Sequence, residues 1–322
     1  MKVSVLSAND QDREFFSKLD HDVVFDKTED TEILAVTHVN EVTKEEIDSM
    51  NNLKLICTRS TGFDHIDLDA AKAKGIIVSN VPAYGENTVA EFTLTIILAL
   101  QRKLAESIKQ ADTGEIDYDK IRGVDLMGQT IGIIGTGKIG YHVAKIAHGF
   151  EMNILGYDPN PNQKFVDEFG VKYVELEELI KTSDIVSLHA PSTEDNTHMI
   201  DEDTLAQMKT SAVLVNTARG ELVDTSALIK ALKEGKIAGA ALDVSEGEGV
   251  LSFEEEADLI HSSDQTQMEL ALEHEVLMKM PNVVFTPHNA FNTIGALDRI
   301  RQTTAENIKD FVDGNPNNIV GG

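Results

Sequence analysis

The stretch IGIIGTGKIG, residues 131–140, decides the fold class of this chain. An apolar strand-like run leads directly into Gly135, Gly137 and Gly140, and the following residues, YHVAKIAHGF, have the pattern of a helix. This order of strand, G-x-G-x-x-G turn and helix is typical of a dinucleotide-binding α/β unit. The glycines permit a tight turn, a close approach of the backbone to a pyrophosphate, and close packing of the helix on the strand. The stretch therefore predicts a doubly wound parallel sheet that binds a dinucleotide.

The residues around this turn predict which dinucleotide is bound. Backbone N–H groups near Lys138 and Ile139, at the start of the helix, are expected to hold the pyrophosphate. The next strand-like segment, NILGY, is followed by Asp158, at the spacing of an acid that binds the adenosine ribose. A carboxylate there accepts hydrogen bonds from both ribose hydroxyls and repels a 2'-phosphate, so NAD is preferred over NADP. The alternative for Asp158 is a turn former before Pro159.

Strand-like runs alternate with helical stretches on both sides of the glycine turn. Those before it are KVSVL, DVVFD, EILAVTH, LKLICTRS and GIIVSN, and those after it are NILGYDP, DIVSLHAP, AVLVNTARG, IAGAALDV and NVVFTPH. Such alternation predicts parallel sheets, and 322 residues exceed the size at which one hydrophobic core stops growing. The predicted fold class is α/β, with two Rossmann-like or flavodoxin-like doubly wound domains and a cleft between them. Helices are expected from Asn87 to about Ala111 and from about Thr293 to Val312.

The composition excludes several classes of partner and site. The chain has 55 acidic and 28 basic residues and a formal net charge of -27, which argues against binding to a nucleic-acid backbone. Its longest apolar segment, from Phe92 to Leu100, is too short to cross a bilayer, and its N-terminus does not resemble a secretory signal. A soluble cytoplasmic protein with no membrane partner is expected. The single cysteine, Cys57, can form neither an internal disulfide nor a thiolate metal cluster, and no metal site is predicted.

Seven segments in a fixed order resemble the family of D-isomer-specific 2-hydroxyacid dehydrogenases over nearly the whole chain. They are RSTGFDHIDL (59–68), NVPAYGENTVAEF (80–92), GIIGTGKIG (132–140), SLHAPSTEDNTHMI (187–200), LVNTARGELVD (214–224), ALDVSEGE (241–248) and TPHNAF (286–291). The resemblance implies a substrate-binding domain of residues 1–98 plus 294–322 and an NAD-binding Rossmann domain of residues 99–293. It also implies a homodimer, with the helix from Asn87 contributing to the interface, and a small 2-oxo or 2-hydroxy acid as the substrate.

Three residues of these segments are implied to be catalytic. Reduction of a 2-oxo acid needs a cation for the carboxylate, a proton donor for the carbonyl oxygen, and a hydride. Arg219 matches the family's substrate arginine, because a guanidinium fork suits a planar carboxylate. His288 matches the general acid/base, because an imidazole can give and take a proton near neutral pH. Glu248 matches the carboxylate that orients this histidine and raises its pKa, with Glu246 as its rival in the same acidic run.

The resemblance assigns further contacts to substrate and cofactor. Backbone N–H groups near Thr61 and Gly62 are implied to receive the substrate carboxylate. Tyr84 is implied to face the substrate, with packing of its loop as the alternative. Domain closure is also implied, because these residues must approach His288. The implied cofactor contacts outside the glycine turn and Asp158 are Pro191, Thr217, Ala218 and Asp243, the last on the nicotinamide side.

Finer features indicate which 2-oxo acid is reduced. The segments RSTGFDHIDL and PAY, and the long separation of Glu248 from His288, are typical of lactate-type members, so pyruvate and D-lactate are the expected pair. Ser245 and Asn292 stand where such members commonly carry an aromatic residue and a tyrosine. These departures leave open a broader reductase of 2-oxoisocaproate, phenylpyruvate, hydroxypyruvate or glyoxylate. An alternative of another class is an NAD-sensing corepressor of the same fold.

Overall fold

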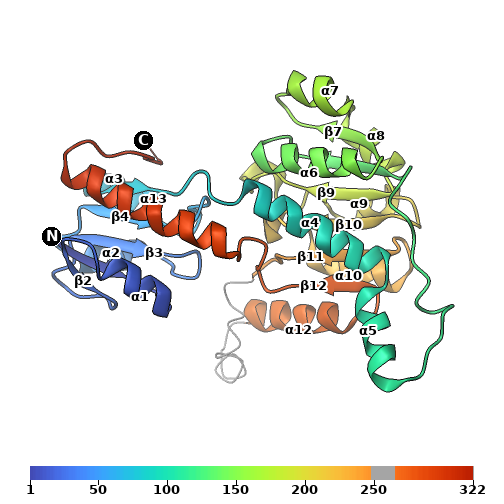
Figure 1. The fold of residues 1–322 in the computed structure, drawn as a ribbon, viewed down its shortest axis with the longest axis horizontal. Coiled ribbons are helices and arrows are strands. Elements are labelled where there is room, and N and C mark those ends of the chain that lie inside the picture. Colours follow the sequence, from blue (N-terminus) through green and yellow to red (C-terminus); the bar gives the residue numbers. More distant parts are fainter. Residues whose placement is uncertain (248–264, 322) are drawn as a thin grey trace. The chain divides into compact units, whose positions relative to one another are not determined.

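The computed structural model describes residues 1–247 and 265–321 of the chain. The chain divides into two compact units, one of Met1–Gly85 with Asn292–Gly322 and one of Glu86–Phe291. Each unit has its own sheet of parallel strands with helices packed on it, which confirms the predicted α/β class (Figure 1). Within the described ranges, no helix is both long enough and apolar enough to cross a membrane.

The first unit has a five-stranded parallel sheet in the order β2-β1-β3-β4-β5. Its strands are β1 (Lys2–Val5), β2 (Asp22–Val24), β3 (Ile33–Val36), β4 (Leu55–Thr58) and β5 (Ile77–Ser79), and its helices are α1 (Asp10–Phe16), α2 (Lys44–Ser49), α3 (Leu68–Ala73) and α13 (Ile294–Val312). This strand order is that of flavodoxin-like sheets. The central strands β3 and β4 are buried at every position, as expected for parallel strands with helices on both faces.

The C-terminal helix α13 completes the core of this unit, where it lies along the N-terminal strands (Figure 1). Ile308 of α13 belongs to the same hydrophobic cluster as Cys57 of β4. Buried ion pairs join α1 to α13 and to the end of β4. Arg301 Nε donates to Asp12 Oδ1 at 2.7 Å, and Arg59 Nη1 lies 3.3 Å from Asp12 Oδ2. The two ends of the chain therefore share one core.

The second unit has a seven-stranded parallel sheet in the order β12-β11-β10-β9-β6-β7-β8. Its strands are β6 (Thr130–Ile134), β7 (Asn153–Tyr157), β8 (Lys172–Tyr173), β9 (Ile185–Leu188), β10 (Val213–Asn216), β11 (Gly239–Leu242) and β12 (Val283–Phe285). Its helices include α4 (Glu86–Gln101), α5 (Leu104–Thr113), α6 (Lys138–Gly149), α7 (Gln163–Phe169), α8 (Leu176–Thr182), α9 (Glu202–Gln207), α10 (Thr225–Lys233) and α12 (Gln265–Lys279). From β8 to β11 the order is that of a Rossmann sheet, with β12 added at one edge. The strand order reverses between β6 and β9, where such sheets bind their ligands.

The helix predicted from Asn87 to about Ala111 is two helices in the structure, α4 and α5. The helical conformation is interrupted at Lys103, which has a left-handed φ of 51°. The Gln101 carbonyl at the end of α4 accepts the Val124 N–H at 2.9 Å, so a later loop closes over this point. Buried apolar side chains of α4 pack in the core of the second unit. The boundary between the two units therefore lies before α4, between Gly85 and Glu86, and not at residue 98 within this helix.

Candidate active site

The predicted site residues of the second unit lie on loops at one edge of its sheet. Its strands are all parallel, so their carboxyl ends meet at the same edge. The loops after β6, β7, β9, β10, β11 and β12 carry, in that order, the glycine turn, Asp158, Pro191, Arg219, Asp243 and His288. The fold therefore gathers residues that lie far apart in the sequence.

The three glycines of the turn have three different surroundings. A Cβ at Gly135, where φ is +93°, would lie 2.6 Å from the carbonyl carbon and oxygen of His189. A Cβ at Gly140 would lie 2.3 Å from the Gly135 oxygen. A Cβ at Gly137 would meet no described atom within 4 Å. Gly135 and Gly140 thus permit the tight turn and the close helix packing, whereas Gly137 leaves open the space that a pyrophosphate fills in this motif.

The start of α6 is suited to binding that pyrophosphate. Gly137 is its N-cap residue, and no side chain in the described part of the molecule caps the helix there. The first N–H groups of an α-helix lack partners inside the helix, and its positive dipole end stabilises an anion. A cavity of about 440 Å³ lies beside this helix start, lined among others by Thr136, Lys138 and Lys164. Its volume is in the range of small-molecule sites.

Asp158 is fixed beside the glycine turn. Its Oδ2 accepts the Thr136 N–H at 2.7 Å, and its Oδ1 accepts the Asn160 N–H at 2.8 Å. The second bond is that of a turn-forming Asp, so the turn role is present in the structure. Each carboxylate oxygen can accept further hydrogen bonds, which leaves capacity for two ribose hydroxyls. The negative charge disfavours a 2'-phosphate at this place, so the arrangement fits NAD rather than NADP.

His189 adjoins the glycine turn but brings no charge to it. Its Nε2 lies 2.8 Å from Ser187 Oγ, and burial lowers the pKa of His189 to about 3. Pro191, two residues further along the same loop, is exposed, and its carbonyl accepts the Asn196 side-chain N–H at 2.8 Å. The loop after β9 is therefore neutral where it borders the turn.

Arg219 lies in a turn after β10 that Asn216 holds closed. The buried Asn216 donates from Nδ2 to the Arg219 carbonyl at 2.7 Å, and its Oδ1 accepts the Ala218 N–H at 3.0 Å. Thr217 Oγ1 lies 2.8 Å from Thr93 Oγ1, which ties the turn to α4. The half-buried Arg219 donates from Nη1 to the Ala218 carbonyl at 2.7 Å. A guanidinium held on such a turn is suited to binding a carboxylate.

Asp243 holds the loop that carries His288. It is 1% exposed, and its Oδ1 accepts the Thr286 hydroxyl at 2.5 Å and the Asn289 N–H at 2.8 Å. Its Oδ2 accepts the Ala290 N–H at 2.8 Å. The Asp243 carbonyl also accepts the His288 N–H at 2.8 Å. Burial raises the pKa of Asp243, while these hydrogen bonds to its carboxylate oppose the rise. The carboxylate is thus engaged with its own loop, and its implied contact with the cofactor stays a prediction.

The hydrogen bonds of Asp243 fix an unusual backbone conformation at His288. The residue has a left-handed φ of 48°, which few residues other than glycine adopt. Its half-buried ring lies edge-on to Phe291, with ring centroids 6.2 Å apart. The imidazole is therefore presented from a loop whose conformation is held by the bonds to Asp243.

The predicted carboxylate partner of His288, Glu248, lies outside the described residues. Its rival, Glu246, is engaged elsewhere, because Glu246 Oε1 lies 2.7 Å from Nε2 of His198. That hydrogen bond raises the pKa of His198. The structure therefore gives Glu246 another histidine as its partner, and Glu248 stays the predicted partner of His288.

Thr61 and Gly62 lie in the loop after β4, in the first unit. Ser60 Oγ donates to the Gly62 carbonyl at 2.7 Å, and Thr61 Oγ1 donates to the Val81 carbonyl at 2.9 Å. Asn80 Nδ2 donates to the Thr61 carbonyl at 2.8 Å. Among the described residues, no acceptor of the chain takes the Thr61 or the Gly62 N–H. The loop is thus fixed through its carbonyls, and both N–H groups are left to bind an anion.

Tyr84 is half-buried near the end of the first unit's N-terminal segment. Its carbonyl accepts Arg299 Nε at 2.7 Å, which ties this segment to α13. The predicted approach of Tyr84 to a substrate, and the cleft itself, depend on how the two units meet and stay predictions.

Several supporting residues are not assigned from the sequence. Asn216 has a recognisable signal, because an Asn between a strand and a turn commonly bonds to the backbone two residues on. Thr286 precedes a proline in TPH, and nothing in that segment points to its bond with Asp243. Thr93 is a third such residue, because it meets the predicted cofactor contact Thr217 across 124 positions and no local pattern reveals this contact.

Comparisons with known proteins agree with this geometry. Residues 94–290 match a family model described as the NAD-binding domain of D-isomer-specific 2-hydroxyacid dehydrogenases. The chain is 38% identical to a 2-hydroxyacid dehydrogenase homolog of Zymomonas mobilis, over 98% of this chain and 98% of that protein. It is 41% identical to an aromatic 2-oxoacid reductase of Clostridium sporogenes, over 80% of this chain and 76% of that protein. A solved structure of D-lactate dehydrogenase from Aquifex aeolicus, complexed with NAD and lactic acid, matches with a TM-score of 0.88 and 36% identity and covers 99% of both chains.

Proposed function

Because the chain belongs to the NAD-dependent family of D-isomer-specific 2-hydroxyacid dehydrogenases, we propose that it interconverts pyruvate and D-lactate. The observation that carries this proposal is the placement of Arg219 and His288. They follow β10 and β12, the two neighbours of β11, on the sheet edge that also holds the glycine turn. NADH, when bound there, supplies the hydride for reduction.

In the proposed reaction, side chains of this protein bind the acid and move its proton. Arg219 forms two parallel hydrogen bonds with the substrate carboxylate and polarises the adjacent carbonyl. His288 donates a proton to the carbonyl oxygen during reduction and takes one from the hydroxyl during oxidation. Glu248 stabilises the protonated imidazole of His288 and thereby raises its pKa. In the first unit, the Thr61 and Gly62 N–H groups also receive the carboxylate, and Tyr84 faces the substrate.

The proposed cofactor contacts follow the strand ends. The Lys138 and Ile139 N–H groups hold the pyrophosphate, and Asp158 holds the adenosine ribose. The remaining contacts, on the loops after β9, β10 and β11, are Pro191, Thr217, Ala218 and Asp243.

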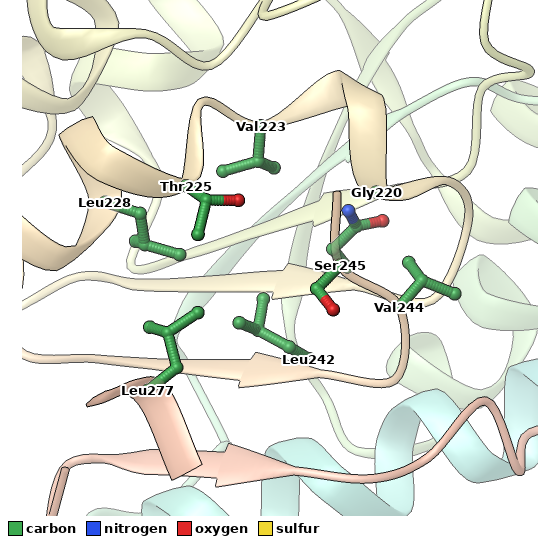
Figure 2. Close-up of a pocket in the computed structure, with 9 residues that line it drawn as sticks. Gly220, Val223, Thr225, Leu228, Leu242, Val244, Ser245 and Leu277 are labelled. Carbon is green, nitrogen blue, oxygen red and sulfur yellow. The ribbon is translucent and has the colours of Figure 1, made fainter. Parts of the chain in front are cut away.

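Ser245 lines a small cavity within the second unit. As Figure 2 shows, Ser245 lies with Gly220, Val244 and Leu277 around a small cavity, whose volume is about 10 Å³. Such a space holds about one water molecule, and no aromatic ring fits into it. Among the described residues that line this cavity, neither Arg219 nor His288 is present, so its size does not bear on the choice between pyruvate and phenylpyruvate.

Oxidation of NADH by a panel of 2-oxo acids, followed by absorbance, tests the proposal. Pyruvate is expected to have the highest kcat/KM, NADPH to be a poor substitute for NADH, and the product to be D-lactate in an enantiomer-specific assay. A higher kcat/KM with phenylpyruvate or 2-oxoisocaproate would instead identify a broader 2-oxo acid reductase. Binding of NADH without turnover of any acid would contradict the enzyme and favour an NAD-sensing binding protein.

We also propose that the protein is a homodimer. Large apolar side chains are exposed in and after α5, namely Leu104 (50%), Ile108 (54%), Tyr118 (78%), Val124 (53%) and Met127 (68%). Exposed apolar side chains in such number favour an interface, and a second copy of this chain is the partner we propose. Light scattering should give twice the mass of one chain, and Ile108→Glu should lower it. A monomer at all concentrations would refute this proposal.

A further inference from the structure

Two segments of the second unit pack on the turn that follows Arg219, the short helix η2 (Gly220–Leu222). On one side, a Cβ at Gly220 would lie 2.2 Å from the carbonyl carbon and oxygen of Ser245 and 2.4 Å from the Glu246 nitrogen. Figure 2 shows Gly220 and Ser245 next to each other. Only a glycine fits here, so the main chain of 245–246 lies directly on the turn.

On the other side, residues 198–200 pair with the same turn. The His198 N–H donates to the Glu221 carbonyl at 2.8 Å, and the Ile200 N–H donates to the Leu222 carbonyl at 3.0 Å. His198 has a left-handed φ of 53°, a conformation that histidine adopts more readily than most residues. The turn is therefore held between two segments of the chain.

The side chain of His198 joins these two segments. Its Nε2 lies 2.7 Å from Glu246 Oε1. A second histidine, His274 of α12, donates from Nε2 to the Glu246 carbonyl at 2.9 Å. Glu246 is thus fastened through its side chain and through its main chain, by histidines from two different elements.

The charges around His198 favour its protonated form. The hydrogen bond with Glu246 raises the pKa of His198, and burial opposes the rise. The negative charges of Glu246, Asp224 and Asp201 raise it further, and the two aspartates are the N-caps of α10 and α9. His274 is the other titratable group that contacts Glu246. Because a charge-assisted hydrogen bond is stronger than a neutral one, the His198–Glu246 bond weakens as pH rises through this pKa.

We propose that His198 is a positioning residue, whose bond to Glu246 fastens residues 245–247 to the turn after Arg219 and so fixes the guanidinium that receives the substrate carboxylate. This inference rests on the proposed function, because it concerns the Arg219 of that reaction. A displaced Arg219 binds the carboxylate less well in the ground state and in the transition state alike. Loss of the bond therefore raises KM for the acid more than it lowers kcat.

The first test compares His198→Gln with His148→Gln, a matched change at an exposed histidine of α6. We expect His198→Gln to raise KM for pyruvate about tenfold, because a small misplacement of a binding group is costly, and to leave KM for NADH unchanged. In the wild type, KM for pyruvate should increase as pH rises above 6.5 through the raised pKa of His198. His198→Gln should lose this step and keep the pH dependence of kcat that His288 causes. His148→Gln should behave as the wild type.

Glu246→Gln repeats the kinetic test from the other side of the pair, should His198→Gln fail to fold. It also permits a test without turnover, an NMR titration of the His198 imidazole. The imidazole pKa should lie above 6.5 in the wild type and fall in Glu246→Gln. Wild-type KM and pH profile in His198→Gln, or an imidazole pKa that Glu246→Gln does not lower, would overturn the inference. If the wild-type protein reduces no 2-oxo acid, the proposed function and the claim about KM both fail. The NMR titration identifies this case, because the raised pKa of His198 persists without turnover.

Discussion

Replacing Asp243 by asparagine tests whether a buried carboxylate holds the loop of His288. The carboxylate accepts three hydrogen bonds, from Thr286, Asn289 and Ala290. An amide nitrogen cannot accept, so one buried N–H would face another donor in the variant. Hydrogen bonds to a charged acceptor contribute about 1.5–3 kcal/mol each, and an unsatisfied buried N–H costs about 1–3 kcal/mol. Burial of the charge, which raises the pKa of Asp243, is relieved by the substitution and offsets part of this loss. The expected net destabilisation is about 2 kcal/mol.

Thermal unfolding and kinetics of Asp243→Asn measure this effect. In a unit of this size, a loss of about 2 kcal/mol lowers Tm by about 4–8 °C. We expect kcat to fall at least about tenfold, because His288 loses its fixed backbone. Asp167→Asn, at an exposed position of α7, is the matched control and should change neither quantity. An unchanged Tm and an unchanged kcat would refute the loop-holding role, and weaker NADH binding alone would leave Asp243 as a cofactor contact only.

Two further substitutions test other parts of the site, and one labelling experiment tests the core of the first unit. His288→Ala should lower kcat by a factor of about 10²–10⁴, the usual contribution of a general acid/base, without weakening NADH binding measured by fluorescence; near-normal rates across pH would contradict its role. Asp158→Ala should raise kcat/KM with NADPH relative to NADH by at least about tenfold, because it removes a negative charge from the site of the 2'-phosphate, and an unchanged ratio would count against that site. The pKa of the buried Cys57 thiol is raised to about 12. It should therefore resist alkylation at pH 8 to 9 (roughly the range of an ordinary thiol's pKa) until the protein unfolds, and rapid labelling of the folded protein would contradict its burial.

Local pattern is sufficient to predict the fold and the strand ends of the site. Each apolar run predicts a strand, and parallel strands bring their carboxyl ends to one edge. Asp158, Arg219 and His288 therefore fall on that edge whatever the details of packing. The glycine turn is local only in part, because Gly140 packs on the Gly135 oxygen, whereas Gly135 packs on the main chain of His189 after β9.

Contacts between distant segments are what the sequence cannot predict. His198 and Glu246 are 48 positions apart, and neither segment indicates the other. The bonds from Asp243 to the His288 loop likewise cross from β11 to β12. The break at Lys103 escapes prediction for a different reason. No glycine or proline marks it, and the bond from Val124 to the end of α4 comes from a loop more than twenty residues later in the sequence.

The first unit takes its strands from the start of the chain and its last helix from the end, which has a consequence for the order of folding. During synthesis, the ribosome delivers the whole second unit before it delivers residues 292–322. Until then, Cys57 and its neighbours lack Ile308, and Asp12 lacks Arg301. The second unit can fold as it emerges, whereas the apolar strands of the first unit stay without part of their core until α13 has been synthesised. Those strands are the part of the nascent chain that a chaperone would need to shield from aggregation.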